Sequence, residues 1–444
     1  MINIFPSHGI IPLAMKTKAI RLHGVRDLRL EEFELPVLKD DEILAKVVSD
    51  SICMSSHKLA MQGSRHKRVR HDLAHEQPLI GHEFCGIIES VGSRWAQQLT
   101  AGQKFAIQPA LNCPDENGNP TPWAPGYSYK FFGGAATRII IPREVMEMNC
   151  LLEYHGDNFY QGSLAEPVSC IIAAFHAQYH SKKNSYIHSM GIAEGGSLAI
   201  IGGAGPMGLC AIDYAIHNAA PGRGRRPSRL IVADIDEKRL LRAKQLISPA
   251  EAHKIGVELA YANISGIQDP AGHLKSLNSG KPFDDVFVFT PDKAALELGD
   301  SLLGYDGCLN FFAGPSDPGF SANVNFYNVH YESHHIIGTT GGNTDDMKEA
   351  LALMSGNVIN PVFMLTHIAG LDAAAQATID LDKTSGGKIL VYTHKKIPLT
   401  AINDFETAGK SDPFFAQLAQ ICSRHGNLWN TEAENYLLAN APEI

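Results

Sequence analysis

Residues 197–208, Ser-Leu-Ala-Ile-Ile-Gly-Gly-Ala-Gly-Pro-Met-Gly, decide the fold of this chain. The apolar run 197–201 predicts a buried strand, and the stretch 206–219 predicts a helix. Between them, Gly203, Gly205 and Gly208 have the spacing of a turn that binds a dinucleotide pyrophosphate. The first glycine would permit a tight turn, the second a close backbone approach to the ligand, and the third close packing of helix on strand. The phosphates would face the helix N-terminus.

A carboxylate, Asp234, ends the next apolar run at residues 230–233. A carboxylate at this point accepts hydrogen bonds from the adenine ribose and repels a 2′-phosphate, and Ile235 rather than an arginine follows. We therefore expect NAD(H) rather than NADP(H), held by Asp234 and by Gly203, Gly205, Pro206, Met207 and Gly208. A glycine turn that serves only packing is the alternative. The arginine-rich insert 222–229 lengthens the connection, and we interpret it as a solvated loop rather than a phosphate site.

The pattern of apolar and turn residues along the chain predicts two kinds of sheet. Short β runs separated by turn residues predict a small, mostly β domain over 16–180, with strands at 17–22, 42–48, 84–91, 104–109 and 136–142 and an exit helix at 166–177. Over 181–342, the apolar runs 197–201, 230–233, 285–289, 308–312 and 335–338 alternate with helical stretches. This alternation predicts an α/β domain, a doubly wound parallel sheet covered on both faces.

The remaining segments flank these two domains. Residues 1–15 are expected to be a disordered leader. Residues 343–398, with a helix at 345–354 and a strand at 388–392, are expected to return to the first domain. Residues 399–444 are expected to form a helical extension with helices at 413–421 and 430–438.

Composition excludes several classes of protein. The net charge of −9 over 444 residues argues against general nucleic-acid binding, which favours basic surfaces. No apolar run approaches the roughly 18 residues of a membrane helix, and the N-terminus lacks the pattern of a signal peptide. The eight cysteines include no Cys-x-x-Cys pair and do not form a disulfide framework. A cytoplasmic protein is expected, because thiols stay reduced there.

A thiol, an imidazole and two carboxylates precede the glycine turn: Cys53, His82, Glu83 and Glu166. Each is unremarkable alone, but catalytic zinc typically takes three S, N or O ligands and leaves a fourth position open. Zinc polarises an alcohol oxygen and lowers its pKa, after which hydride can leave the same carbon for a nicotinamide. Their order along the chain therefore favours an oxidoreductase with zinc beside NAD.

With these motifs the chain resembles the zinc-dependent medium-chain dehydrogenases, over roughly residues 16–392. Cys53, Gly81-His82-Glu83, Glu166-Pro167, the glycine turn and Asp234 carry the resemblance. It implies a GroES-like β domain joined to a Rossmann domain, with the active site in the cleft between them. The longer segments 51–56, 81–86, 310–315 and 341–347 are most similar to those of the L-sorbose 1-phosphate reductases.

The resemblance implies roles for the metal-site residues. Cys53, His82 and Glu166 would be zinc ligands, with Glu83 a nearby carboxylate that can also ligate the metal. Cys170 lies four residues after Glu166 on the same helical face. In some alcohol dehydrogenases a cysteine at this position is the zinc ligand. The alternative for Cys170 is a core residue.

Further roles and two departures follow from the same resemblance. Ser55 would pass the alcohol proton toward solvent, with Glu83 taking part in catalysis beside it. The family often has an aspartate where Ser56 stands, so His82 must be oriented by another group, with Glu83 as the candidate. The four-cysteine lobe that binds structural zinc is absent, since only Cys113 lies in that region. We therefore expect one catalytic zinc and no structural zinc.

The segment 57–76, between Cys53 and His82, is rich in cations. Lys58, Arg65 and Lys67 could hold a sugar phosphate through charge-assisted hydrogen bonds. A solvated surface loop is the alternative for each of them.

Together these features predict interconversion of a ketose phosphate and a polyol phosphate. The resemblance suggests the pair L-sorbose 1-phosphate and D-glucitol 6-phosphate. The rival is another polyol or polyol-phosphate dehydrogenase, of the sorbitol or galactitol-phosphate type, and a remote alternative is a non-catalytic dinucleotide-binding protein. A small-molecule substrate and no nucleic-acid or membrane partner are expected. By analogy with the family, so is a homo-oligomer, a dimer or a tetramer.

Overall fold

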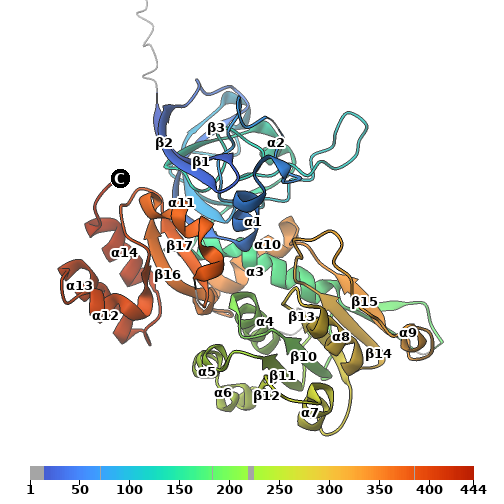
Figure 1. Ribbon diagram of the computed structural model, residues 1–444. Helices are drawn as coiled ribbons and strands as arrows, with labels where there is room; N and C mark the ends of the chain where they lie inside the picture. Colours follow the sequence, from blue (N-terminus) through green and yellow to red (C-terminus); the bar gives the residue numbers. More distant parts are fainter. Residues whose placement is uncertain (1–14, 71, 183, 219–224, 385) are drawn as a thin grey trace, which may run out of the picture.

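The computed structural model describes residues 15–444 except 71, 183, 219–224 and 385. Two β-sheets lie side by side, and a long helix, α3 (Tyr160–Ala177), runs between them (Figure 1). The expected leader lies almost entirely outside the described residues, as does part of the arginine-rich insert. Within the described residues, no helix has the length and apolar character needed to cross a membrane.

The first sheet is parallel and has six strands in the order β12-β11-β10-β13-β14-β15. They are β10 (Ser197–Ile201), β11 (Arg229–Asp234), β12 (Glu258–Asn263), β13 (Phe283–Val288), β14 (Leu303–Phe311) and β15 (His335–Gly338). The connecting helices are α4 (Pro206–His217), α5 (Glu237–Leu246), α6 (Pro249–Lys254), α7 (Pro270–Leu277), α8 (Lys293–Leu302) and α9 (Phe326–Tyr331). The order reverses between β10 and β13, which confirms the doubly wound Rossmann prediction. A ligand crevice is expected at that reversal.

The second sheet is mostly antiparallel and follows the order β18-β16-β17-β3-β4-β5-β7, with β6 paired to β3. Its strands are β3 (Ile43–Ile52), β4 (Phe84–Val91), β5 (Lys104–Ile107), β6 (Arg138–Ile141), β7 (Leu151–Glu153), β16 (Leu365–Gly370), β17 (Lys388–Tyr392) and β18 (Thr400–Ala401). β1 (Lys16–Gly24) and β2 (Asp27–Glu34) form a hairpin beside it. The pairing of β17 with β3 returns the chain to this sheet. The boundaries at residues 180, 342 and 398 remain predictions.

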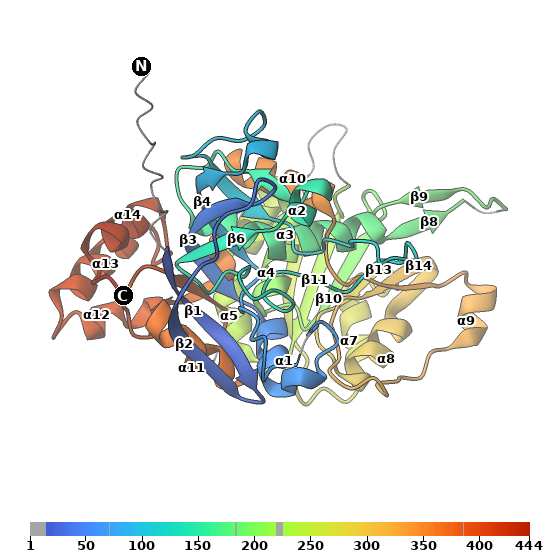
Figure 2. The same ribbon diagram turned by 90° about the horizontal axis from the view of Figure 1, so that it is seen from above.

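Shorter helices connect and cover this sheet. They are α1 (Met54–Gln62), α2 (Arg143–Glu147), α10 (Thr344–Ser355) and α11 (Leu371–Ile379). α10 packs along α3, and a hairpin of β8 (Tyr179–Ser181) and β9 (His188–Met190) follows α3. Figure 2 shows this hairpin projecting from the end of the molecule that holds β14.

Helix α3 begins at Tyr160, earlier than the sequence predicts. Its first turn contains no acidic residue, and the residue that caps it, Phe159, has no polar side chain. N-terminal helix signals in sequence are Ser, Thr, Asp or Asn caps, and the local signal here is Asn158, one residue before Phe159, whose side-chain oxygen accepts from the Gln161 amide at 3.1 Å.

The C-terminal extension contains α12 (Phe405–Ala408), α13 (Pro413–Arg424) and α14 (Thr431–Asn440). The last two fall where the sequence predicts helices, because Asp412 and Asn430 cap them and apolar residues recur along one face. In Figure 1 the extension lies beside β16 and β17, and in both views it lies at the opposite end of the molecule from β14.

Candidate functional site

The ends of two paired strands bring the candidate metal ligands together. Cys53 follows β3 and caps the start of α1, while His82 and Glu83 come directly before β4. β3 and β4 are antiparallel, with Asp50 opposite Phe84. The end of β3 therefore meets the start of β4, and residues far apart in the chain become neighbours.

The ligand atoms of Cys53, His82 and Glu83 all lie within 4.8 Å of one another. Within the described part of the chain this is the one group of three such side chains. Sulfur, nitrogen and oxygen donors at this spacing suit zinc. The donor set therefore fits the metal that the sequence predicts.

Hydroxyl groups surround the imidazole of His82. Ser55 Oγ lies 2.9 Å from Cys53 Sγ and 3.4 Å from His82 Nε2, and Tyr127 Oη lies 3.5 Å from the same nitrogen. On the other side of the ring, Ser56 Oγ lies 3.4 Å from His82 Nδ1. The ring thus meets Ser56 where the family often has an aspartate.

Glu83, which the sequence suggested as the group orienting His82, is held elsewhere. Its carboxylate oxygens lie 2.7 and 2.5 Å from the Lys388 ammonium, and the Ser51 hydroxyl donates to it. The side chains of Lys388 and Glu83 are 6% and 1% exposed. The expectation that Glu83 orients His82 is therefore corrected. Glu83 is neutralised by a buried lysine from β17, and Ser56 occupies the orienting position.

Glu166 approaches the same group from α3. The Cys170 thiol donates to Glu166 Oε1 over 3.5 Å, so these two side chains share one face of the helix as the spacing predicts. Glu166 acts electrostatically on Cys53, whose pKa it helps to raise. It lies beside the three-residue group without completing it.

Burial shifts the titration of these groups. It raises the pKa of Cys53 to about 12, with the Glu83 charge adding to the effect. Burial raises the pKa of Glu166 to about 8 and lowers the pKa of His82 to about 4, which keeps the imidazole in its neutral, ligating form. Burial alone would lower the pKa of Lys388, but the Glu83 and Cys53 charges outweigh it and the pKa rises. The site is thus short of positive charge.

The glycine turn offers space for a dinucleotide. Gly205 caps α4 in an extended conformation, and a Cβ there would meet no atom within 4 Å. A Cβ on Gly208 would overlap the Gly203 carbonyl, as expected for close packing. The strained backbone position is Gly202, with φ of 69°, so the tight turn begins one residue earlier than the sequence suggests. The residues present therefore fit a pyrophosphate at the helix N-terminus.

Asp234 lies at the end of β11, beside this turn. One carboxylate oxygen accepts from the Ala204 amide at 3.0 Å, and the other accepts from the Ile235 and Asp236 amides. The carboxylate thus fixes the turn, and its negative charge stands where a dinucleotide ribose would lie.

The cationic segment divides into exposed and partly buried members. Arg65 and Lys67 are exposed, whereas Lys58 and Arg68 are partly buried. The Lys58 ammonium donates to the Gly314 carbonyl and so connects α1 with the loop after β14. No carboxylate of the described residues forms an ion pair with Lys58 or Arg68.

Arg68 and Tyr127 connect this segment to the metal site. The guanidinium carbon of Arg68 lies 4.9 Å from the centroid of the Tyr127 ring, and His66 stacks on that ring at 5.3 Å. Since the Tyr127 hydroxyl is close to His82 Nε2, Arg68 lies about one ring away from the ligand group. Its charge contributes to the low pKa of His82.

Comparison with known proteins decides the family. The model of the alcohol dehydrogenase GroES-like domain matches residues 39–149, and that of the zinc-binding dehydrogenases matches residues 206–356. L-sorbose 1-phosphate reductase of Klebsiella pneumoniae is 48% identical over 96% of this chain and 98% of its own. Mannitol-1-phosphate 5-dehydrogenase of Aliivibrio fischeri is 47% identical over 95% of this chain and 97% of its own. The chain belongs to the zinc-dependent medium-chain polyol dehydrogenases.

Solved structures agree on the fold. The 2R,3R-butanediol dehydrogenase of Bacillus subtilis superimposes with a TM-score of 0.64 at 20% identity, covering 85% of this chain and 99% of its own. L-idonate 5-dehydrogenase of Escherichia coli gives a TM-score of 0.63 at 17% identity, covering 86% and 99%. The predicted union of a GroES-like domain and a Rossmann domain is confirmed.

Sequence reasoning missed Lys388, Ser51 and Tyr127. Lys388 opens an expected strand, and nothing local distinguishes it from a solvated lysine. Tyr127 lies in a loop with no motif. Only the pairing of β17 with β3 brings Lys388 beside Glu83.

The Lys388–Glu83 pair yields a prediction on stability. Replacing Lys388 by methionine leaves a buried carboxylate without its cation, and we expect a loss of about 3–5 kcal/mol in the free energy of unfolding. Urea unfolding would measure this. The double variant Glu83→Gln/Lys388→Met removes both charges and should recover most of the loss. Equal stability of Lys388→Met and the parent protein would show that the pair is not a buried ion pair in solution.

Proposed function

We propose that this protein is a zinc-dependent, NAD(H)-linked reductase that interconverts a ketose phosphate and a polyol phosphate. The observation that carries the proposal is the placement of Arg68 one tyrosine ring away from the Cys53–His82 group. A metal-ligand group would act at a hydroxyl or carbonyl carbon. A nearby cation that forms no ion pair with any carboxylate of the described residues would favour a phosphorylated substrate. We infer a small-molecule substrate, a cytoplasmic location and, by family analogy, a homo-oligomer.

The metal would be held by Cys53, His82 and Glu166, with one zinc per chain and no structural zinc. We favour Glu166 over Glu83 as the third ligand because Lys388 and Ser51 already engage the Glu83 carboxylate. Glu83 then takes part in catalysis from beside the ligands, by holding Lys388 in place. When bound, zinc supplies Lewis-acid polarisation of the substrate oxygen.

The chain's own residues handle the proton. Ser55 Oγ lies between Cys53 Sγ and His82 Nε2, so a substrate oxygen at this position could exchange a proton with the Ser55 hydroxyl. The Tyr127 hydroxyl faces the same space and can orient that oxygen. The glycine turn and Asp234 would hold the dinucleotide, whose nicotinamide would supply the hydride chemistry.

We propose that Arg68 and Lys58 bind the phosphate. Both are partly buried, and Lys58 reaches the loop after β14 from α1. The exposed Arg65 and Lys67, which the sequence suggested with Lys58, contribute only to the general positive field. Charge-assisted hydrogen bonds from arginine are well suited to a phosphate.

We propose L-sorbose 1-phosphate and D-glucitol 6-phosphate as the substrate pair. The similarity to mannitol-1-phosphate 5-dehydrogenase makes another polyol phosphate the second candidate. The test is oxidation of NADH, with NADPH in parallel, in the presence of L-sorbose 1-phosphate or unphosphorylated L-sorbose. The second candidate is tested in the oxidative direction, by reduction of NAD in the presence of D-mannitol 1-phosphate.

We expect chelator-sensitive turnover of a phosphate ester, faster with NADH than with NADPH. Turnover of D-mannitol 1-phosphate alone would move the assignment to the second candidate. Turnover of free sugar alone would exclude a sugar phosphate. No turnover, combined with tight NADH binding and no zinc, would favour the non-catalytic alternative.

Arg68 provides a sharper test of the phosphate site. Arg68→Gln removes a charged hydrogen bond worth about 1.5–3 kcal/mol, so kcat/KM for the phosphate ester should fall about 10- to 100-fold. Lys58→Met should act in the same direction. The matched controls Arg65→Gln and Lys67→Gln should stay within about twofold, because exposed charges contribute little. Equal effects at Arg65 and Arg68 would place the phosphate elsewhere.

The third ligand is tested by paired variants of α3. Glu166→Ala should lose zinc. Removing a residue that only supports a metal ligand typically lowers metal affinity about 10- to 100-fold, so removing a ligand should lower it by at least that much. Cys170→Ala should retain it. Metal content and chelator competition measure both. Loss of zinc from Cys170→Ala alone would make the cysteine the ligand.

A further inference from the structure

The N-terminus of α3 depends on a residue from the far end of the chain. The first amides of a helix have no partner within it. In α3 the Gln161 amide has a local acceptor, the Asn158 side-chain oxygen at 3.1 Å, but no neighbouring side chain serves the Phe159 and Tyr160 amides among the described residues. Glu434, in α14, fills this gap. Its carboxylate accepts from the Phe159 amide at 2.6 Å and from the Tyr160 amide at 2.9 Å. Burial raises the pKa of Glu434 to about 7, and its ionised form is also favourable toward the helix dipole at this end.

Glu434 is completely buried and is itself held in place. The Tyr392 hydroxyl donates to it at 2.8 Å, and the Trp429 indole donates to that hydroxyl at 2.9 Å. Trp429 belongs to the same extension, whereas Tyr392 ends β17, the strand that begins with Lys388. One strand therefore connects the Glu434 contact to the Glu83 contact.

The start of α3 also touches the strand that leads to Cys53. The Ser49 hydroxyl donates to the Phe159 carbonyl at 3.1 Å, and the Ser163 hydroxyl donates to the Ser49 carbonyl at 2.9 Å. A Cβ on Gly162 would overlap the Cys85 side chain, so α3 and β4 are in close contact here. The first turn of α3 is thus packed against β3 and β4, the strands whose ends carry the ligand group.

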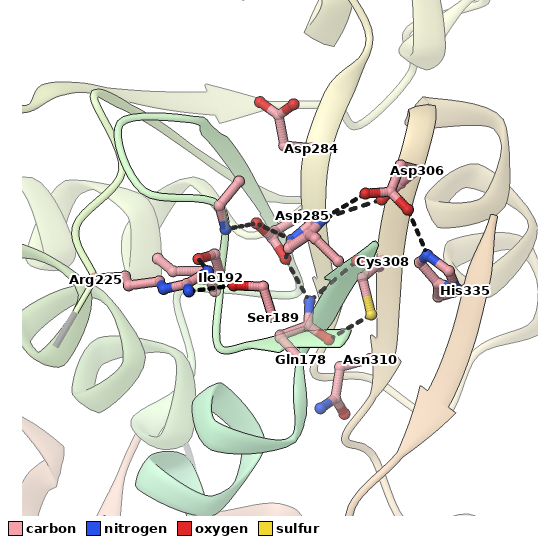
Figure 3. Close-up of polar contacts among 12 residues, drawn as sticks. Gln178, Ser189, Ile192, Arg225, Asp284, Asp285, Asp306, Cys308, Asn310 and His335 are labelled. Atoms are coloured by element: carbon pink, nitrogen blue, oxygen red, sulfur yellow. Dashed lines mark hydrogen bonds and ion pairs between the residues drawn. The ribbon is translucent and has the colours of Figure 1, made fainter. Parts of the chain in front are cut away.

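The other end of α3 is fixed to the Rossmann sheet. In Figure 3, Gln178 lies between Asp285 and Cys308, and its side-chain amide donates to both residues, at 2.9 and 3.0 Å. Asn310, on the same strand as Cys308, donates to the Ala174 carbonyl at 3.1 Å. These contacts hold the helix to the coenzyme domain, independently of the extension.

Glu166 lies between these two anchors, directly before Pro167. Proline has no amide, so the helix lacks the hydrogen bond that would close on the Ser163 carbonyl. A helix interrupted in this way is free to bend at that point. The direction of the segment that carries Glu166 is therefore set by the contacts at its two ends, and one of them is Glu434.

We propose that the C-terminal extension is a positioning element of the metal site, in which Glu434 fixes the first turn of α3 and thereby the place of Glu166. The family matches end at residue 356, so this role lies outside the segments that define the family. The proposal rests on the proposed function only in naming Glu166 as a ligand. Glu434 is a positioning residue and touches no reactant.

The variants should separate positioning from general stability. Glu434→Gln keeps an acceptor oxygen but turns an amide group toward one of the two helix amides. Tyr392→Phe removes one donor to Glu434 and keeps the ring. Leu418→Ala is the control, because Leu418 is buried in α13, which packs on α12 and α14.

The first measurement is hydrogen exchange along α3 in the full-length protein. In Glu434→Gln we expect faster exchange over residues 159–166 and unchanged exchange over 171–177, which the Rossmann contacts hold. Tyr392→Phe should give a smaller change of the same kind. Leu418→Ala should lower the melting temperature without this local change. Equal exchange over 159–166 in the parent protein and in Glu434→Gln would overturn the proposal, and so would an identical change in Leu418→Ala.

The second measurement is the metal itself. In Glu434→Gln we expect zinc affinity to fall on the order of tenfold in chelator competition, with an altered visible spectrum of the cobalt-substituted protein. KM for the phosphate ester should change little, since Arg68 is untouched. Zinc affinity and cobalt spectrum equal to those of Leu418→Ala would overturn the link to Glu166. Failure of the parent protein to bind any metal would sink the proposed function, while hydrogen exchange would still decide the role of Glu434.

Discussion

A shortage of buried positive charge governs this structure. The acidic groups Glu83, Cys53, Glu166 and the buried Asp50 all feel the charge of one buried lysine, Lys388. Burial raises the pKa of Cys53, Glu166 and Asp50 above their ordinary values. Oδ1 of Asp50 has no hydrogen-bond partner among the described residues. Desolvated carboxylates are costly unless a cation or hydrogen bonds compensate them. The same arrangement that costs folding free energy would therefore favour the binding of a divalent cation, as proposed for Cys53, His82 and Glu166.

This constraint explains why distant segments must meet. β3 brings Cys53, β4 follows His82 and Glu83, and β17 brings Lys388. A metal ligand group built at strand ends is rigid because the ladder hydrogen bonds fix each strand. Such rigidity is what orients ligands for catalysis.

The sequence was informative where chemistry is local. The glycine turn, the apolar strands of the Rossmann sheet and the Cys53 and His82 donors could all be predicted, because turn geometry and ligand chemistry restrict the residue types at those positions. Lys388, Tyr127 and Glu434 could not be predicted, since each acts through a partner brought near only by the tertiary fold. The start of α3 was missed partly for the same reason: Asn158 caps the Gln161 amide locally, but the acceptor for the Phe159 and Tyr160 amides comes from α14. Exposure likewise separates Arg68 from Arg65, and the sequence alone does not reveal exposure.

Helix α3 is the element that both halves of the proposed reaction share. One end is packed on the strands that carry the candidate metal ligands, and the other is bonded to the Rossmann sheet. Hydride transfer requires the reacting carbon and the nicotinamide to be held at a fixed separation, because small displacements of the reacting atoms slow the reaction strongly. A continuous helix between the two sheets fixes that separation, provided that neither end slips. Because the hydrogen bonding of α3 is interrupted at Pro167, the helix alone does not hold its first turn in place. The buried Glu434 carboxylate from the extension supplies the contact that does.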